Sequence, residues 1–191
     1  MERKLVFWNP QFGAEEKALV ADVIDSGFLN DGEVTSRFEQ QIAALLGCKH
    51  VVAVTSGTAA IFLALAGIGV GTGDEVIVPD VTFIATANAV TLTGAKPVLA
   101  DVDPQRLTLD PQAVERAITS RTKAIVPVHV SGRAADLDGI LDIGRRHGIQ
   151  VVEDAAEAFC PNAKAGVWER LVSQDASPCR RTRPSLRARA A

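Results

Sequence analysis

The sequence predicts an α/β protein, with a mostly parallel sheet and helices on both faces. Short runs rich in Val and Ile recur along the chain at 51–54, 75–78, 97–100, 124–128 and 149–152. Each of the first four runs is followed by a segment with helical features, at 57–67, 83–93, 111–119 and 136–147. Unbroken apolar runs are typical of parallel strands buried on both faces. Their alternation with helices indicates successive βα units in one sheet.

Two amphipathic helices are expected before the first strand. The first covers about 14–25 and carries its apolar residues on one face, with Gly27 just beyond its end. The second covers about 34–46, and Gly47 is expected to stop it. The apolar residues of these two faces are Leu19, Val20, Val23 and Ile24 in the first, and Phe38, Ile42, Leu45 and Leu46 in the second.

Charge divides the chain into two segments. Residues 1–160 contain 13 Lys+Arg and 21 Asp+Glu, a net charge of −8, whereas 161–191 contain 7 and 2, a net charge of +5. The second segment shows neither helical nor strand periodicity, and five arginines fall among its last twelve residues. We therefore predict a folded α/β segment over 1–160 and a basic Arg/Pro/Ser-rich tail over 161–191 that is poorly ordered.

Several classes of protein are disfavoured. The N-terminus lacks the apolar core of a signal peptide, and no apolar run is long enough to span a membrane. The three cysteines have neither disulfide nor zinc spacing, so we expect reduced thiols, a cytoplasmic protein and no metal site. There is no GxxxxGK[ST] motif, and the glycines at 67–71 follow a helix instead of opening one, which excludes a dinucleotide fingerprint there. The basic tail lacks interleaved aromatic residues, so no nucleic-acid partner is expected.

The turn Thr55-Ser56-Gly57-Thr58 joins the first predicted strand to the helix 57–67. The first amides of a helix have no partners within the helix, and its dipole places partial positive charge there. With Gly57 allowing close approach and two hydroxyls nearby, this turn suits a phosphate. The alternative is that Ser56 only caps the helix.

Three further residues follow predicted strands at the same edge of the sheet. Phe83 comes after the run 75–78, where its ring either lies against a flat ligand or packs in the core. Asp154 follows the last run and either pairs with a protonated heteroaromatic nitrogen or caps a helix. His129 follows 124–128 and is either a ligand contact or, more commonly, a structural histidine. Ligands of parallel α/β sheets gather at this carboxyl edge.

Several segments, taken together and in order, are more informative than any single motif. They are SGFLNDGEVTSRFEQQIAALLGCKHVVAV, SGTAAIFLAL, GTGDEVIVPDVTFIATANAV, GAKPVLADVDPQRLTLD, ITSRTKAIVPVHVSG and HGIQVVEDAAEA. Over about residues 5–160 this series resembles the sugar aminotransferases of the DegT/DnrJ/EryC1/StrS family. The resemblance implies the large domain of a type I pyridoxal-phosphate enzyme. It also implies transfer of an amino group, from glutamate, to a nucleotide-linked keto sugar for polysaccharide or antibiotic synthesis, by a homodimer.

The resemblance also implies roles for individual residues. The turn would bind the phosphate of pyridoxal 5'-phosphate, Phe83 would stack on its ring, and Asp154 would pair with its ring nitrogen. Glu157 would lie near the ring hydroxyl, and the loop FLNDG would border the substrate. The implied cofactor-binding residues are Ser56, Gly57, Thr58, Ala59, Phe83, Asp154 and Glu157, and the implied substrate-binding residues are Phe28, Leu29 and Asn30.

The lysine that the family uses to form a Schiff base with the cofactor has no counterpart here. After Asp154 the only lysine is Lys164, which is too close and in no matching context, and arginine cannot replace a lysine nucleophile. We therefore predict that this chain supplies no catalytic residue and is truncated before the lysine, where the resemblance ends, with a tail over 161–191 that is either disordered or read out of frame. The alternatives are a non-catalytic fragment or pseudoenzyme, which at most binds cofactor or a full-length subunit, and a related dehydratase with histidine in place of the lysine.

Overall fold

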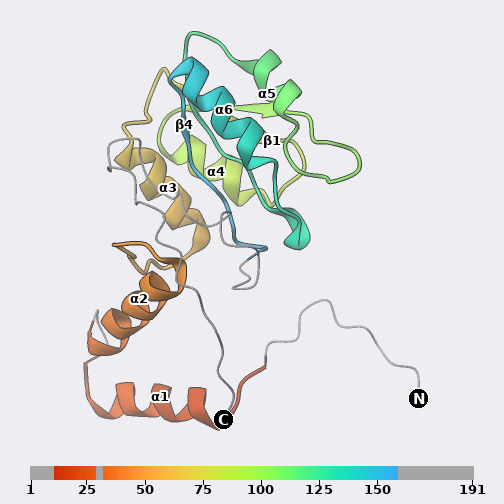
Figure 1. The fold of residues 1–191 in the computed structure, drawn as a ribbon. Coiled ribbons are helices and arrows are strands. Elements are labelled where there is room, and N and C mark those ends of the chain that lie inside the picture. The colour runs from red at the N-terminus through yellow and green to blue at the C-terminus, as the bar shows by residue number, and fades with distance from the viewer. Residues whose placement is uncertain (1–10, 29–31, 159–191) are drawn as a thin grey trace. The chain divides into compact units, whose positions relative to one another are not determined.

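The computed structural model describes residues 11–28 and 32–158, in two compact units that divide between Ala53 and Val54 (Figure 1). The described part of the first unit holds helices α1 (Ala14–Asp25) and α2 (Glu33–Leu46). Gly47 ends α2 in the left-handed conformation, with φ of 68°, as its lack of a Cβ permits. Both predicted helices are confirmed, whereas the predicted tail 161–191 lies outside the described residues.

The second unit is a three-layer α/β structure. Its parallel sheet has four strands in the order β2-β1-β3-β4, which confirms the predicted fold class. A short 3-10 turn, η1 (Val130–Gly132), precedes α6. The strands are β1 (Glu75–Pro79), β2 (Lys96–Ala100), β3 (Thr122–Ile125) and β4 (Gln150–Val151), and the helices are α3 (Gly57–Gly67), α4 (Ala85–Leu92), α5 (Pro111–Ala117) and α6 (Leu137–His147). No helix among the described residues has both the length and the apolar character needed to cross a membrane.

The strand predicted at 51–54 is wrong. This segment forms no strand in the described part of the chain, and Val52 is 76% exposed. A strand requires a neighbour for its backbone N–H and C=O groups, and no described strand pairs with 51–54. The last strand is also shorter than predicted, and the chain beyond β3 continues as an isolated bridge between Val128 and Asp154.

The alternation of strand side chains creates two cores. Val76, Val78 and Val126 face α3 and α4, together with Val152. Ile77 lies between Val76 and Val78, so its side chain is on the other face of the sheet, where it packs with α5 and α6. Helices α3 and α4 therefore cover one face of the sheet, and α5 and α6 the other (Figure 1).

Helix α3 runs opposite to the strands. Its last turn leads through a short loop directly into the start of β1, and Gly71 in that loop bonds to Asp74. The loop also meets the end of α4, since a Cβ built on Gly94 would lie 2.7 Å from Oγ1 of Thr72. The C-terminal ends of α3 and α4 thus lie at the amino edge of the sheet. Their N-termini consequently lie at its carboxyl edge.

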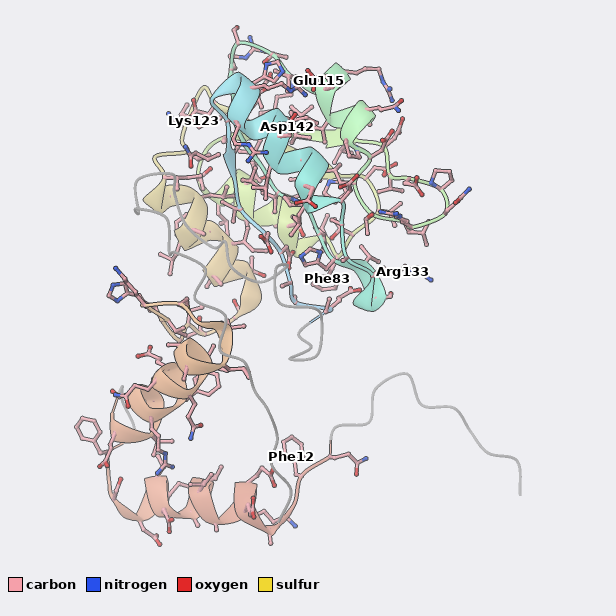
Figure 2. All side chains as sticks on the ribbon, viewed as in Figure 1. Phe12, Phe83, Glu115, Lys123, Arg133 and Asp142 are labelled. Atoms are coloured by element: carbon pink, nitrogen blue, oxygen red, sulfur yellow. The ribbon has the colours of Figure 1, made fainter. Side chains whose placement is uncertain are left out.

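Ion pairs join α5 to α6 on the outer face, where Figure 2 shows Glu115 and Asp142. Arg146 donates to both carboxylate oxygens of Glu115, at 3.0 and 2.7 Å, and His147 lies 2.8 Å from one of them. These hydrogen bonds, with that from Arg146 the larger cause, lower the pKa of Glu115 from 4.5 to about 2. The ionised form of Glu115 therefore favours the folded state.

We predict that Gly144→Ala destabilises the fold by about 1–3 kcal/mol, because the new methyl group has no room. Its Cβ would lie 2.8 Å from the backbone oxygen of Ile149 and 3.0 Å from Cγ2 of Val151. Gly67→Ala is the matched control, since nothing lies within 4 Å of its added Cβ. Urea unfolding measures both, and equal stability of the two variants would contradict the packing described.

We predict that Glu115→Gln removes part of the acid sensitivity of folding. Because the folded pKa of Glu115 is depressed, its contribution is complete above about pH 4.5 and declines as the pH falls toward 2. The stability gap between the wild type and Glu115→Gln should therefore be larger at pH 7 than at pH 3 in urea unfolding. A gap that stays constant with pH would show that the ion pair does not form.

Candidate functional site

The start of α3 presents unpaired backbone donors. The Oγ of Ser56 accepts the N–H of Ala59 at 3.2 Å, which confirms the alternative interpretation of Ser56 as a helix cap, and the contacts of Ser56 and Ala59 with a cofactor stay predictions. Among the described residues nothing accepts the amides of Gly57 and Thr58. A Cβ built on Gly57 would meet no atom within 4 Å, so the space beside the Cα of Gly57 is open. Two free amides at the positive end of a helix dipole suit an anion.

Phe83 stands just before α4 with its ring in solvent. Its side chain is 70% exposed, and Figure 2 shows it at the periphery of the second unit, so the alternative of a core residue is wrong. Its carbonyl accepts the N–H of Thr86 at 3.2 Å, which begins the helix. An exposed aromatic ring held by an ordered backbone is available to stack on a planar ligand.

Asp154 is buried and held at four points. Its backbone N–H donates to Pro127 at 2.9 Å, and its carbonyl accepts the N–H of His129 at 3.0 Å. In its side chain, Oδ1 accepts the N–H of Ala156 at 3.1 Å and Oδ2 accepts the hydroxyl of Thr86 at 2.8 Å. Each carboxylate oxygen has a second lone pair, so both oxygens retain capacity for one more donor.

The sequence analysis did not identify Thr82 and Thr86, whose hydroxyls are linked to this carboxylate by hydrogen bonds. The Thr86 side chain is fully buried, and its Oγ1 lies 3.2 Å from Oγ1 of Thr82. The signal was present as two hydroxyls four residues apart in TFIAT, one helical turn from each other. Their carboxylate partner, Asp154, is 68 residues from Thr86 in the sequence, so local spacing does not reveal the hydrogen bond between them.

The start of α3, Phe83 and Asp154 share one edge and one side of the sheet. Asp154 lies two residues after Val152, which belongs to the core under α3 and α4, and its carboxylate meets Thr86 of α4 on that side. The N-termini of α3 and α4 lie at the carboxyl edge, where Asp154 follows β4. The structure thus has the predicted phosphate turn, the aromatic ring and the carboxylate at the same edge and on the same side of the sheet, and their contacts with a cofactor stay predictions.

The side chains of His129, in the segment between β3 and α6, and of Glu153, after β4, lie on the opposite face. His129 is fully buried; its Nδ1 accepts the N–H of Ala135 at 3.0 Å, and its Nε2 lies 3.4 Å from Oε2 of Glu153. A ring nitrogen that accepts carries no proton, so the ring proton is on Nε2, toward the carboxylate. The interpretation of His129 as a structural histidine is confirmed.

The structure leaves the roles predicted for Glu157, Phe28, Leu29 and Asn30 untested. Glu157 is exposed, and its Oε2 accepts the N–H of Ser131 at 2.9 Å, so its contact with a cofactor stays a prediction. Phe28 belongs to the first unit and is 59% exposed. Leu29 and Asn30 lie outside the described residues, so the substrate-binding prediction is untested.

The lysines described in the second unit lie far from Asp154. Lys96 opens β2 and Lys123 lies near the start of β3, both at the amino edge. Figure 2 shows Lys123 toward the upper left of the second unit and Phe83 near its lower end. Among residues 11–28 and 32–158, no group of three His, Cys, Asp or Glu side chains is placed to hold a metal ion.

Comparison with known proteins identifies relatives for most of the chain. The spore coat polysaccharide biosynthesis protein SpsC of Bacillus subtilis (strain 168) is 50% identical over 149 residues, which cover 78% of this chain and 38% of SpsC. The X-ray structure of DesV from S. venezuelae is 48% identical with a TM-score of 0.74, covering 76% of this chain and 39% of DesV. NtdA from Bacillus subtilis, solved with its cofactor PMP bound, is 32% identical with a TM-score of 0.74, covering 83% and 39%.

This chain therefore spans less than half the length of each of these relatives. The family model of the DegT/DnrJ/EryC1/StrS aminotransferases matches residues 10–167, which is most of the sequence. The agreement of the family model, the curated relative and the solved structures establishes that the chain belongs to the DegT/DnrJ/EryC1/StrS aminotransferase family.

Proposed function

We propose that the chain is the cofactor-binding part of a pyridoxal-phosphate-dependent transaminase that aminates nucleotide-linked keto sugars, with glutamate as the amino donor. The observation that carries this proposal is the shared position of the α3 N-terminus and the Asp154 carboxylate, on one face at the carboxyl edge of the sheet. That arrangement occurs in a chain of an aminotransferase family, one relative of which was solved with PMP bound.

The residues present fit pyridoxal phosphate. The free amides of Gly57 and Thr58 suit its phosphate, and the open space beside the Cα of Gly57 leaves room for it. The exposed ring of Phe83 is available to stack on the pyridine ring. The remaining lone pairs of Asp154 suit a protonated ring nitrogen, because a buried carboxylate stabilises an N–H donor that carries positive charge.

When bound, the cofactor supplies an electron-accepting ring that stabilises negative charge at the Cα of the amino donor. Asp154 would keep the ring nitrogen protonated, which would strengthen this electron demand. Phe83 would stack on the ring and exclude water from that side. The amides at the start of α3 would hold the phosphate.

The sugar substrate and the cell context follow from the relatives by analogy. The name of SpsC refers to polysaccharide biosynthesis, which supports an amino sugar destined for a polysaccharide. We propose a cytoplasmic homodimer with its active sites at the subunit interface, as the family resemblance implies.

A second candidate is a non-catalytic protein that binds the cofactor, alone or with a full-length subunit. The position of Lys96 and Lys123 at the amino edge favours it, because neither lysine reaches the carboxyl edge where Asp154 lies. A transaminase needs a lysine near the cofactor as nucleophile and as general base.

We predict that Asp154→Asn weakens the binding of pyridoxal phosphate by about tenfold or more, since a charge-assisted hydrogen bond contributes about 1.5–3 kcal/mol. Asp80→Asn is the matched control: Asp80 follows β1 at the same edge, is exposed, and makes no side-chain hydrogen bond with the described residues. Equilibrium dialysis against labelled cofactor gives both affinities. Equal affinities for the two variants, or no binding by the wild type, would contradict the proposed site.

We predict that borohydride reduction of this chain with pyridoxal phosphate leaves no stoichiometric lysine adduct, because the described lysines of the second unit, Lys96 and Lys123, lie at the amino edge of the sheet and Asp154 lies at the carboxyl edge. Intact-mass analysis after reduction measures the adduct, and dialysis without reduction shows whether the cofactor binds reversibly. A one-to-one adduct at a single lysine would exclude the non-catalytic candidate and identify the missing nucleophile.

A further inference from the structure

Thr86 connects the two side chains proposed to contact the cofactor ring. Its backbone N–H donates to the carbonyl of Phe83 at 3.2 Å, and its Oγ1 donates to Oδ2 of Asp154 at 2.8 Å. Its side chain is fully buried, so water does not compete for the hydroxyl. One residue in the first turn of α4 thus joins the segment before α4 to the segment after β4.

The hydroxyl chain has a defined direction. An ionised carboxylate only accepts hydrogen bonds, so the single proton of Thr86 Oγ1 is directed to Asp154. The Oγ1 of Thr82, 3.2 Å from that of Thr86, is therefore the donor of the second contact. The order is Thr82 to Thr86 to Asp154, and each bond polarises the next.

We propose that Thr86 is a positioning residue that fixes the orientation of the Asp154 carboxylate and its placement relative to Phe83, with Thr82 holding the Thr86 hydroxyl. The inference rests on the proposed function, in which that carboxylate pairs with the cofactor nitrogen. Oδ1 is held by the N–H of Ala156 and Oδ2 by Thr86. With both oxygens held, the carboxylate plane is fixed and its remaining lone pairs keep one direction.

Removal of the Thr86 hydroxyl leaves Oδ2 of a buried carboxylate without its donor. The carboxylate then turns to seek other donors, and its bond to the N–H of Ala156 is weakened as well. The Ala156 amide is thus a reporter of carboxylate orientation that needs no bound cofactor.

The experiment compares Thr86→Val, which removes the hydroxyl at nearly constant shape, with Thr86→Ser, which keeps it. Thr91→Val is the control on the same helix, because Thr91 is exposed and, within the described part of the chain, its hydroxyl bonds only to the carbonyl of Ala87. Amide hydrogen exchange is measured by NMR in the chain without cofactor, at Ala156 and at Val126. The Val126 N–H donates to Ile77 inside the sheet and reports global opening.

Thr86→Val should raise the exchange rate at Ala156 about tenfold relative to that at Val126, for the loss of about one hydrogen bond. Thr86→Ser and Thr91→Val should leave this ratio near the wild-type value. If Thr86→Val does not fold, Thr82→Val is measured in its place. It removes the hydroxyl that bonds to Thr86 and should raise the ratio by a smaller factor. An unchanged ratio at Ala156 in these hydroxyl-deleting variants overturns the inference, whether or not cofactor binds.

The same variants are then tested for pyridoxal phosphate binding by dialysis. Thr86→Val should weaken binding about tenfold and Thr86→Ser should restore it, since one net hydrogen bond corresponds to roughly that factor. Full affinity in Thr86→Val overturns the positioning role. The two proposals can fail separately. If the variants change exchange at Ala156 as expected but the wild-type chain does not bind the cofactor, the proposed function is contradicted and the positioning of the Asp154 carboxylate by Thr86 is still supported.

Discussion

Parallel pairing beyond the ends of β3 and β4 is the constraint on which the site depends. Backbone hydrogen bonds from Asp154 to Pro127 and from His129 to Asp154 continue the ladder past the last strand residues. Because strand side chains alternate between faces, this register sends Asp154 to the side of α3 and α4 and sends Glu153 to the side of α5 and α6. A slip of one residue would exchange the two carboxylates.

The same alternation gives Glu153 a structural partner and leaves Asp154 available for the proposed contact with a ligand. Glu153 faces a fully buried histidine that holds the loop after β3, so its carboxylate has a structural partner. Asp154 has donors on both oxygens yet retains lone pairs at an edge where helix amides are free. Two adjacent acidic residues in the sequence therefore have different roles, because the sheet directs them into different surroundings.

Most of the fold could be predicted from local pattern, because the apolar runs and helix signals of β1, β2 and α3 are contained in neighbouring residues. The prediction of a strand at 51–54 was wrong for the opposite reason. Its apolar run favours a strand, but a strand forms only where a neighbour that is remote in sequence pairs with it. Phe83, Asp154 and the α3 turn were identified from their positions after apolar runs and from the family resemblance. Thr86 was missed because a threonine inside a helix has no local mark of a distant carboxylate partner.

The nitrogen-15 chemical shift of ring-labelled pyridoxal phosphate tests the central claim most directly, because it reports whether the pyridine nitrogen carries a proton. If the Asp154 carboxylate pairs with that nitrogen, the cofactor bound to the wild-type chain gives the shift of a protonated pyridine. In Asp154→Asn, the shift should move toward that of an unprotonated ring. A bound cofactor with the same shift in both proteins would contradict the account.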